Sequence, residues 1–244
     1  MKEGRGATFE DRRQAMLSDP VWIGPIPIHV WLIEHSEGLF LVDTGQLSGQ
    51  ADTPIVRWIL DREDEIDVQL QRRGFSEADL RSVVLTHLHT DHMNGVRHFL
   101  RTQISVSRTE LDSFHRAPPF NPIAEHALLS PFTFLDEAFG AFDQNLPVTQ
   151  DGSIRIVPTP GHTLGHASVI VVENNVHYFL AGDVCFSLDM LLKGHVDGVS
   201  QEAARAQETF RRTLAHAGTN PTVFLPSHDP DSEYRLSNKV LLKG

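Results

Sequence analysis

The feature that most constrains this chain is the segment Thr-His-Leu-His-Thr-Asp-His-Met-Asn-Gly, which spans Thr86–Gly95. It follows the apolar run Val83–Leu85, which is typical of a buried strand. Asn94 and Gly95 then mark the start of another element. The segment is therefore predicted to be a loop that connects a strand to a helix.

This loop concentrates side chains that bind metals, namely His87, His89, Asp91 and His92. In an extended chain residues two apart face the same side, so His87 and His89 are expected to converge on one ion. Asp91 and His92 lie beyond the predicted bend and are expected to point to a second ion. One loop is thus predicted to begin two metal sites.

Further candidate ligands follow other predicted strands of the chain. Active-site residues of α/β proteins often lie in loops held by a rigid scaffold, so these loops are expected to meet. The candidates at these strand ends are Asp43, His162, Asp183 and His228.

The remaining pattern alternates strands with helices, which indicates an α/β fold. Ile28–Ile33 and Leu39–Val42 are predicted to form a hairpin, and 54–73 has helical periodicity. Ser200 is predicted to cap a helix that runs to Ala217. With 244 residues and 40% apolar content, residues 1–244 are expected to form a single domain.

A segment rich in proline and phenylalanine, at about 117–142, interrupts this pattern and is expected to be an insertion or cap. Proline breaks regular structure, while exposed aromatic rings need to be covered by core or ligand. Two interpretations stay open, a core-packing excursion and a cover for a substrate. The second would place Phe120, Phe132, Phe134 and Phe139 in a substrate pocket.

Composition narrows the classes of partner and compartment. The net charge of −11 disfavours a nucleic-acid surface or an anionic membrane surface, since both need clustered Lys and Arg. Met1–Leu17 has no apolar core of the kind a signal peptide needs, and the longest apolar runs are too short to cross a bilayer. Cys185 is the only cysteine, so no intrachain disulfide is expected. A cytoplasmic protein is predicted.

Together the motifs resemble those of the metallo-β-lactamase-fold hydrolases. The resemblance rests on His-x-His-x-Asp-His from His87 to His92, Gly-His at His162, Gly-Asp at Asp183, Ser-His-Asp at 227–229, and Val-Asp-Thr-Gly at 42–45. It implies a four-layer αββα sandwich of two mixed β-sheets flanked by helices.

The resemblance also implies two divalent metal ions, with zinc expected and iron, cobalt or manganese as alternatives. It implies that Asp183 bridges the ions and that Asp43, His166 and Asp229 support the ligands. Cys185 is expected to be a buried core thiol. The implied ligands are His87, His89 and His162 for the first ion, and Asp91, His92 and His228 for the second.

Within these hydrolases the chain most resembles the N-acyl-homoserine lactone lactonases. This implies that a bridging hydroxide attacks a lactone carbonyl and that Asp91 protonates the leaving alkoxide. Many of those enzymes have a tyrosine three residues after the bridging aspartate, where this chain has Phe186. A substrate contact is expected at Phe186, and the substrate is expected to be a small lactone or ester. A homodimer is left open as the assembly.

Other functions remain as alternatives. The missing hydroxyl at Phe186 keeps open an aryl-ester hydrolase or an organophosphate-type hydrolase of the same fold. A thioester hydrolase fits less well because the C-terminal segment 230–244 has few basic residues. A catalytically inert metal-binding protein would have no evident reason to keep a complete ligand set.

Overall fold

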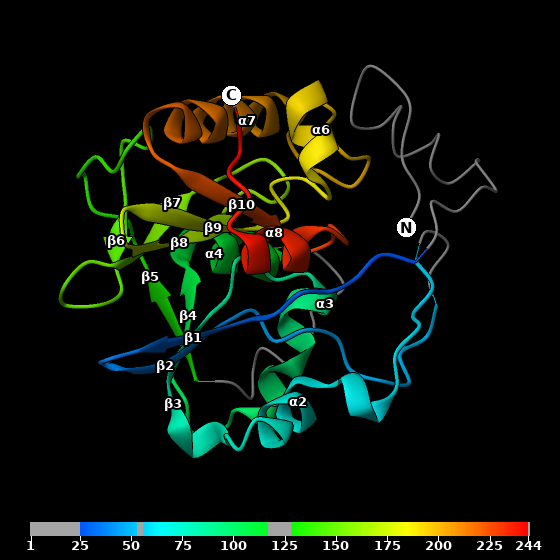
Figure 1. Cartoon of the computed structure of the whole chain (residues 1–244). Coiled ribbons are helices and arrows are strands. Elements are labelled where there is room, and N and C mark those ends of the chain that lie inside the picture. The colour runs from blue at the N-terminus through cyan, green and yellow to red at the C-terminus, as the bar shows by residue number, and fades with distance from the viewer. Residues whose placement is uncertain (1–24, 53–55, 117–127, 244) are drawn as a thin grey trace. The chain divides into compact units, whose positions relative to one another are not determined.

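The computed structural model describes residues 25–52, 56–116 and 128–243. The predictions for Met1–Leu17, Phe120 and the first part of the 117–142 segment lie outside the described residues. The chain forms two compact units (Figure 1), a first unit of Ile28–Phe132 and a second unit that combines Met1–Pro27 with Thr133–Gly244. Each unit holds one five-stranded sheet.

The first unit alternates strands with short helices. Its sheet begins with an antiparallel hairpin, in which Trp31 pairs with Val42, and continues with parallel strands in chain order. Its α-helices are α2 (Ile66–Arg72), α3 (Thr90–Met93) and α4 (Arg108–Arg116), with 3₁₀ helices at Arg62–Asp64, Glu77–Asp79 and Asn94–His98. Its strands are β1 (Trp31–His35), β2 (Gly38–Val42), β3 (Leu80–Val84), β4 (Ile104–Ser107) and β5 (Leu129–Phe132).

The core of the first unit lies on its central strands. Leu41, Val83 and Ile104 come from β2, β3 and β4 and are completely buried. Parallel strands covered on both faces need such runs of apolar residues, which explains why Val83–Leu85 reads as a strand. This core carries the loop of predicted ligands at the end of β3.

The second unit has a mixed sheet in the order β10-β9-β8-β7-β6, in which only the β10/β9 pair is parallel. Its helices α6 (Leu188–Lys193) and α7 (Ala203–Thr219) pack against the sheet (Figure 1), and α8 (Ser232–Asn238) follows β10. Its strands are β6 (Leu146–Pro147), β7 (Ile154–Pro158), β8 (Ala167–Glu173), β9 (Val176–Gly182) and β10 (Thr222–Pro226).

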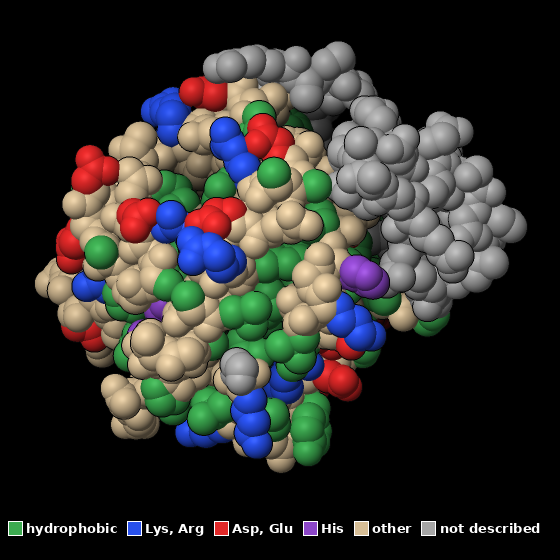
Figure 2. Space-filling view, turned by 90° about the horizontal axis from the view of Figure 1, so that it is seen from above, with side chains coloured by type: hydrophobic (Ala, Val, Ile, Leu, Met, Phe, Trp, Pro, Cys, Tyr) green, Lys and Arg blue, Asp and Glu red, His purple; other side chains and the backbone are tan. Residues whose placement is uncertain are grey.

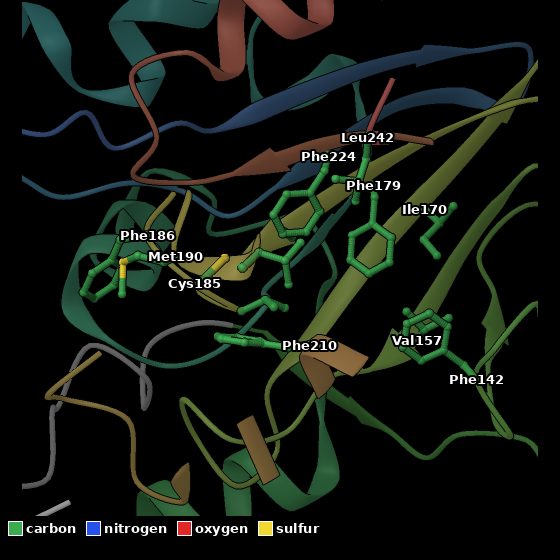
Figure 3. Packing of buried hydrophobic residues seen from close by; sticks show 13 residues of the cluster. Phe142, Val157, Ile170, Phe179, Cys185, Phe186, Met190, Phe210, Phe224 and Leu242 are labelled. Atoms are coloured by element: carbon green, nitrogen blue, oxygen red, sulfur yellow. The ribbon is translucent and has the colours of Figure 1, made fainter. Parts of the chain in front are cut away.

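Phenylalanines dominate the core of the second unit. Phe210 of α7 packs in one cluster with Phe179 of β9 and Phe224 of β10, whose rings are 5.7 Å apart. Figure 3 shows this cluster extending from Phe186 at one end to Phe142 at the other. Removing a fully buried ring of this kind costs about 3–5 kcal/mol of stability.

The structure corrects several predicted boundaries. The helix predicted at 54–73 is reduced to the 3₁₀ turn Arg62–Asp64 and α2, because Asp61 and Asp64 form a capping box that restarts the chain. Ser200 does not cap α7, which begins at Ala203, because its hydroxyl donates to Asp197 instead. Within the 117–142 segment, Leu129–Phe132 forms β5, and an insertion or cap at about 117–142 stays a prediction.

The outer edge of β10 is covered by α8 and the residues that follow it. The carbonyl of Thr222 accepts a hydrogen bond from the Leu242 amide at 2.7 Å, and the carbonyl of Phe224 accepts one from Arg235 Nε at 3.0 Å. Ser232 Oγ donates to the Pro226 carbonyl at 2.8 Å. These bonds satisfy carbonyls that an uncovered edge strand would offer to another chain.

Charged side chains of both signs are mixed on the face that Figure 2 shows, among the described residues. On α6 and α7 they form ion pairs, such as Lys193 with Asp189 at 2.8 Å and Arg211 with Glu208 at 2.6 Å. Within the described ranges, no helix combines the length and apolar character needed to span a membrane.

Candidate metal centre

The loop after β3 brings together the histidines that the sequence singled out in the first unit. His87, Asp91 and His92 are buried, and His89 is half-buried. The ring centroids of His87 and His89 are 4.6 Å apart, and those of His87 and His92 are 4.1 Å apart. Asp91 and His92 lie in α3, which begins directly after His89. This arrangement gathers three imidazoles and a carboxylate within one short segment.

Asp43, at the end of β2, holds this loop. Its Oδ1 accepts a hydrogen bond from the Thr86 amide at 2.7 Å, and its Oδ2 accepts one from Thr86 Oγ1 at 2.9 Å. His92 Nδ1 lies 2.8 Å from the same Oδ2. Because an ionised carboxylate only accepts, His92 donates from Nδ1 and a neutral ring keeps a lone pair on Nε2 for a metal.

Thr86 extends the same arrangement to His87. Its hydroxyl donates to Asp43, so it can accept from His87 Nδ1, which lies 3.0 Å away. A neutral His87 then also presents the lone pair of Nε2. One carboxylate therefore orients two predicted ligands, one directly and one through a hydroxyl group.

Two further residues support this loop, of which the sequence marked only Gly95, as the start of another element. Glu110 of α4 is buried and accepts a hydrogen bond from the Leu88 amide at 3.0 Å, between His87 and His89. Gly95 packs so closely against the backbone of Thr44 that an added Cβ would clash with the Thr44 carbonyl oxygen. Both depend on tertiary contacts, so no local signal marks Glu110, while the Asn-Gly step does mark Gly95.

The other predicted ligands form a group in the second unit, at the ends of β7, β9 and β10. Asp183 Oδ2 lies 3.3 Å from His162 Nε2 and 3.2 Å from His228 Nε2. His228 Nδ1 lies 2.8 Å from the Pro27 carbonyl and donates to it. A neutral His228 then directs the lone pair of Nε2 at the carboxylate. Two such lone-pair-bearing atoms, a ring nitrogen and a carboxylate oxygen, are suited to bind the same cation.

His166 supports this group through the backbone. The Asp183 amide donates to His166 Nε2 at 3.0 Å, so His166 carries its proton on Nδ1. That Nδ1 lies 3.1 Å from the Thr159 carbonyl, to which it donates. His166 thus holds the backbone of Asp183, and its support of a metal ligand stays a prediction.

Asp229 makes different contacts from those expected of a carboxylate that orients a histidine. Its Oδ2 accepts from the Leu188 amide at 2.7 Å and pairs with Arg235 at 2.7 Å. These bonds connect the residue after His228 to the start of α6 and to the middle of α8. Support of a ligand histidine by Asp229 stays a prediction.

Asp197 is a buried carboxylate that the sequence did not single out. Its Oδ2 lies 3.5 Å from His162 Nδ1. Burial would raise the pKa of Asp197, but attraction to His162 and hydrogen bonds from His162 and Ser200 outweigh burial, so the pKa lies below its ordinary value. The side chain is therefore charged at neutral pH.

Comparison with known proteins agrees with this geometry. The family model described as the metallo-beta-lactamase superfamily matches residues 23–241. This chain belongs to the metallo-beta-lactamase superfamily.

Among curated members, the N-acyl homoserine lactonase AttM of Agrobacterium fabrum is 25% identical over 95% of this chain and 87% of its own length. Two solved structures share the fold. One is an N-acyl homoserine lactone hydrolase with the product N-hexanoyl-L-homoserine at its catalytic metal centre, at TM-score 0.73 and 21% identity, covering 91% of this chain and 90% of the other. The other is AidC, a dizinc quorum-quenching lactonase, at TM-score 0.62 and 20% identity, covering 84% and 73%.

These matches confirm the predicted metallo-beta-lactamase fold of two mixed sheets flanked by helices, and the relatives bear the names of metal-dependent hydrolases. The donor set suits such enzymes, because imidazoles and carboxylates bind zinc and also iron, cobalt and manganese.

Phe186 lies beside two of the predicted ligands in the second unit. Its ring centroid is 6.0 Å from that of His162 and 5.2 Å from that of His228, and both contacts are edge-on. Cys185, next to it, is fully buried, and burial raises the pKa of its thiol well above the ordinary value. The prediction of a core thiol at Cys185 agrees with these findings.

The other predicted pocket residues are spread along the chain. Phe132 ends β5 and Phe134 is half-buried. Phe139 stacks on His177 at a centroid distance of 5.7 Å, and His177 lies at the opposite end of β9 from Asp183. These contacts assign Phe139 to the core, and a substrate role for these rings stays a prediction.

One more cluster of metal-binding side chains occurs in the first unit, formed by Glu65, Asp67 and His98. Arg62 already supplies a positive charge there, since it donates to Asp67 Oδ1 at 2.7 Å. Glu65 also accepts from the Ser48 amide at 3.0 Å and pairs with His98 at 2.9 Å. The cluster is thus a hydrogen-bonded and ion-paired network that connects the start of α2 with the 3₁₀ helix Asn94–His98.

Proposed function

We propose that this chain is a dinuclear metal-dependent hydrolase that opens lactones, with N-acyl-homoserine lactones as the substrate class. The observation that carries the proposal is the convergence of His162 Nε2 and His228 Nε2 on one oxygen of Asp183, at 3.3 and 3.2 Å. Membership of the superfamily and the order of the motifs support the rest of the site.

The proposed ligands divide between two ions, for which zinc is favoured and iron, cobalt or manganese are the alternatives. Two divalent cations about 3.5–4 Å apart would acidify a water and polarise a substrate carbonyl. Asp183 is proposed to bridge the ions. The first ion would be held by His87, His89 and His162, and the second by Asp91, His92 and His228.

The proton balance of the reaction assigns a role to Asp91. Hydrolysis joins a water oxygen to the carbonyl carbon and breaks the ring C–O bond, so the leaving alkoxide must gain a proton. Asp91 is buried, and its Oδ2 lies 3.9 Å from His92 Nε2, beside the histidines of the first unit. We assign to a carboxyl oxygen of Asp91 the transfer of that proton, which it would take from the attacking water and give to the alkoxide.

The relatives support a lactone substrate, because AttM is named an N-acyl homoserine lactonase and two structural neighbours are lactonases. Phe186 supports a second candidate. Its ring lies against His162 and His228 but cannot donate a hydrogen bond to a substrate carbonyl. An aryl ester or a phosphotriester, whose leaving group departs more readily than an alkoxide, would need that donor less.

The test is a pH-stat assay of the zinc-loaded chain with N-hexanoyl-homoserine lactone, an aryl ester, a phosphotriester and a thioester. Ring opening releases a carboxylic acid that ionises, so the titrant consumed counts turnovers directly. The lactone is expected to turn over fastest. If the aryl ester or the phosphotriester is hydrolysed and the lactone is not, the second candidate function is right.

The variant His89→Ala tests the centre itself. It is expected to lose both metal and activity, while the variant His195→Ala, at an exposed histidine, should keep both. A protein that binds two ions but turns over none of the four substrates would be the inert metal-binding protein. A cytoplasmic location and the homodimer stay predictions.

A further inference from the structure

We propose that Asp197 is a positioning residue for His162, and that it fixes the orientation in which this histidine binds a metal. The inference rests on the metal centre proposed above. It concerns a carboxylate that lies outside every motif of the sequence.

The imidazole of His162 lies between two carboxylates. Its Nε2 is 3.3 Å from Asp183 Oδ2, and its Nδ1 is 3.5 Å from Asp197 Oδ2. The three side chains are at most 3% exposed. A carboxylate on the Nδ1 side favours the tautomer with a proton on Nδ1, and Nε2 is then free to bind the ion.

Asp197 is itself rigidly held. Its Oδ1 accepts from the Val199 amide at 2.9 Å and from the Ser200 amide at 2.7 Å. Its Oδ2 accepts from Ser200 Oγ at 2.6 Å, which leaves that oxygen a further lone pair toward His162. The carboxylate is therefore a fixed acceptor rather than a mobile counter-ion.

The backbone around Asp197 is also bound to the loop of His162. The His162 carbonyl accepts from the Gln201 amide at 3.0 Å, and the Gly161 carbonyl accepts from the Glu202 amide at 2.9 Å. At Gly161, where φ is +143°, an added Cβ would lie 2.4 Å from backbone atoms of Ala206. The start of α7 and the ligand loop thus form one packed piece.

The distance of 3.5 Å from His162 Nδ1 to Asp197 Oδ2 is longer than a charge-assisted N–H···O bond of about 2.8 Å. A shift of the His162 ring by roughly 0.7 Å would form this hydrogen bond. Asp43 stands in the same relation to His92, at 2.8 Å. In the proposed centre each ion would then have one histidine backed by a buried carboxylate. Such partners typically change metal affinity by about 10–100-fold.

The test uses Asp197→Asn in the full chain, with Zn²⁺ as the probe. The amide oxygen can still accept from the amides of Val199 and Ser200, but its NH₂ group cannot accept the His162 proton. Zinc affinity is measured by competition with a chromophoric chelator, and the ligand field by the visible spectrum of the cobalt-loaded protein. Asp189→Asn, at an exposed aspartate, is the matched control.

Asp197→Asn is expected to bind one zinc as the wild type does and the other about 10–100-fold more weakly, with an altered cobalt spectrum. Two zinc ions at wild-type affinity with an unchanged spectrum would overturn the inference, whatever happens to stability. If Asp197→Asn does not fold, Ser200→Ala is measured in the same way, since it removes the hydrogen bond to Oδ2 but keeps the charge and the two amide hydrogen bonds of Oδ1. Weaker binding of one zinc would support the inference, and two zinc ions at wild-type affinity with an unchanged cobalt spectrum would overturn it.

The proposed centre can fail separately from this inference. A wild-type chain that binds fewer than two zinc ions, or a His162→Ala variant that still binds both tightly, would contradict the centre. A wild type with two ions, one of them lost in His162→Ala, together with an unaffected Asp197→Asn, would contradict only the role of Asp197.

Discussion

Asp43 Oδ2 lies 2.8 Å from His92 Nδ1, and both side chains are at most 1% exposed. A buried carboxylate in this position satisfies the histidine and also the amide and hydroxyl of Thr86. Its removal therefore leaves several buried donors without acceptors. Such a residue couples the stability of the loop to the orientation of the ligands.

Asp43→Ala is expected to lower the free energy of unfolding by about 2–4 kcal/mol, because each buried donor left unpaired costs about 1–3 kcal/mol. Urea unfolding of the metal-free protein measures this loss. Asp43→Asn is the matched variant, since Asn tolerates the φ of 62° and can still accept from the Thr86 amide. Equal stability of Asp43→Ala and wild type would contradict the prediction.

His166→Phe is expected to destabilise the second unit by about 2–3 kcal/mol. The ring would fill much of the space but could neither accept from the Asp183 amide nor donate to the Thr159 carbonyl. Hydrogen exchange of the Asp183 amide measures the first loss directly. If that amide stays as protected in His166→Phe as in wild type, His166 does not hold it.

Phe186→Tyr is expected to raise kcat for lactones by roughly tenfold, because one added donor to a developing oxyanion is worth that or more. The site should still bind two zinc ions, since the ring lies edge-on to His162 and His228 and is not itself a ligand. Steady-state kinetics with lactone and aryl ester compare the two reactions. An unchanged lactone kcat with intact metal content would show that the hydroxyl does not reach the substrate.

The free energy of unfolding is expected to fall as pH drops from about 6.5 to about 4. Burial and the neighbouring His177 lower the pKa of His216 from 6.5 to about 4, so the unfolded chain takes up a proton in this range that the folded chain does not. Stability is thus fully present above the unfolded pKa and declines below it. The loss is about 1–3 kcal/mol over the window.

Urea unfolding of the metal-free wild type and of His216→Gln at several pH values measures this decline. The predicted ligand histidines titrate in both proteins, so their contribution cancels when the pH dependence of the variant is subtracted from that of the wild type. His195→Gln, at an exposed histidine, should behave as wild type. A His216→Gln variant with the same pH dependence as wild type would exclude His216 as the cause.

The sequence predicted those parts of the structure around the candidate site that depend on short-range pattern. Val83–Leu85 and the His-x-His-x-Asp-His motif are adjacent in the chain, so the strand and the loop of candidate ligands could be predicted together. Asp183 and His228 were predictable because each follows a clear apolar strand. In these cases the local pattern and the tertiary structure agree.

The contacts that were missed depend on the tertiary structure. Asp197 and Glu110 reach the ligand loops from segments with no motif of their own. The predicted helix at 54–73 failed for a related reason, since Ile59, which fits the helical pattern, is 77% exposed and gains nothing from being helical. A periodic pattern predicts a helix only where the fold provides a surface to cover it.

The hydrogen bond from Leu242 to Thr222 means that the segment after α8 covers the outer edge of β10. Deleting residues 239–243 would leave the carbonyl groups of that edge open to pairing with other molecules in solution. For recombinant production, these residues are therefore better kept in place.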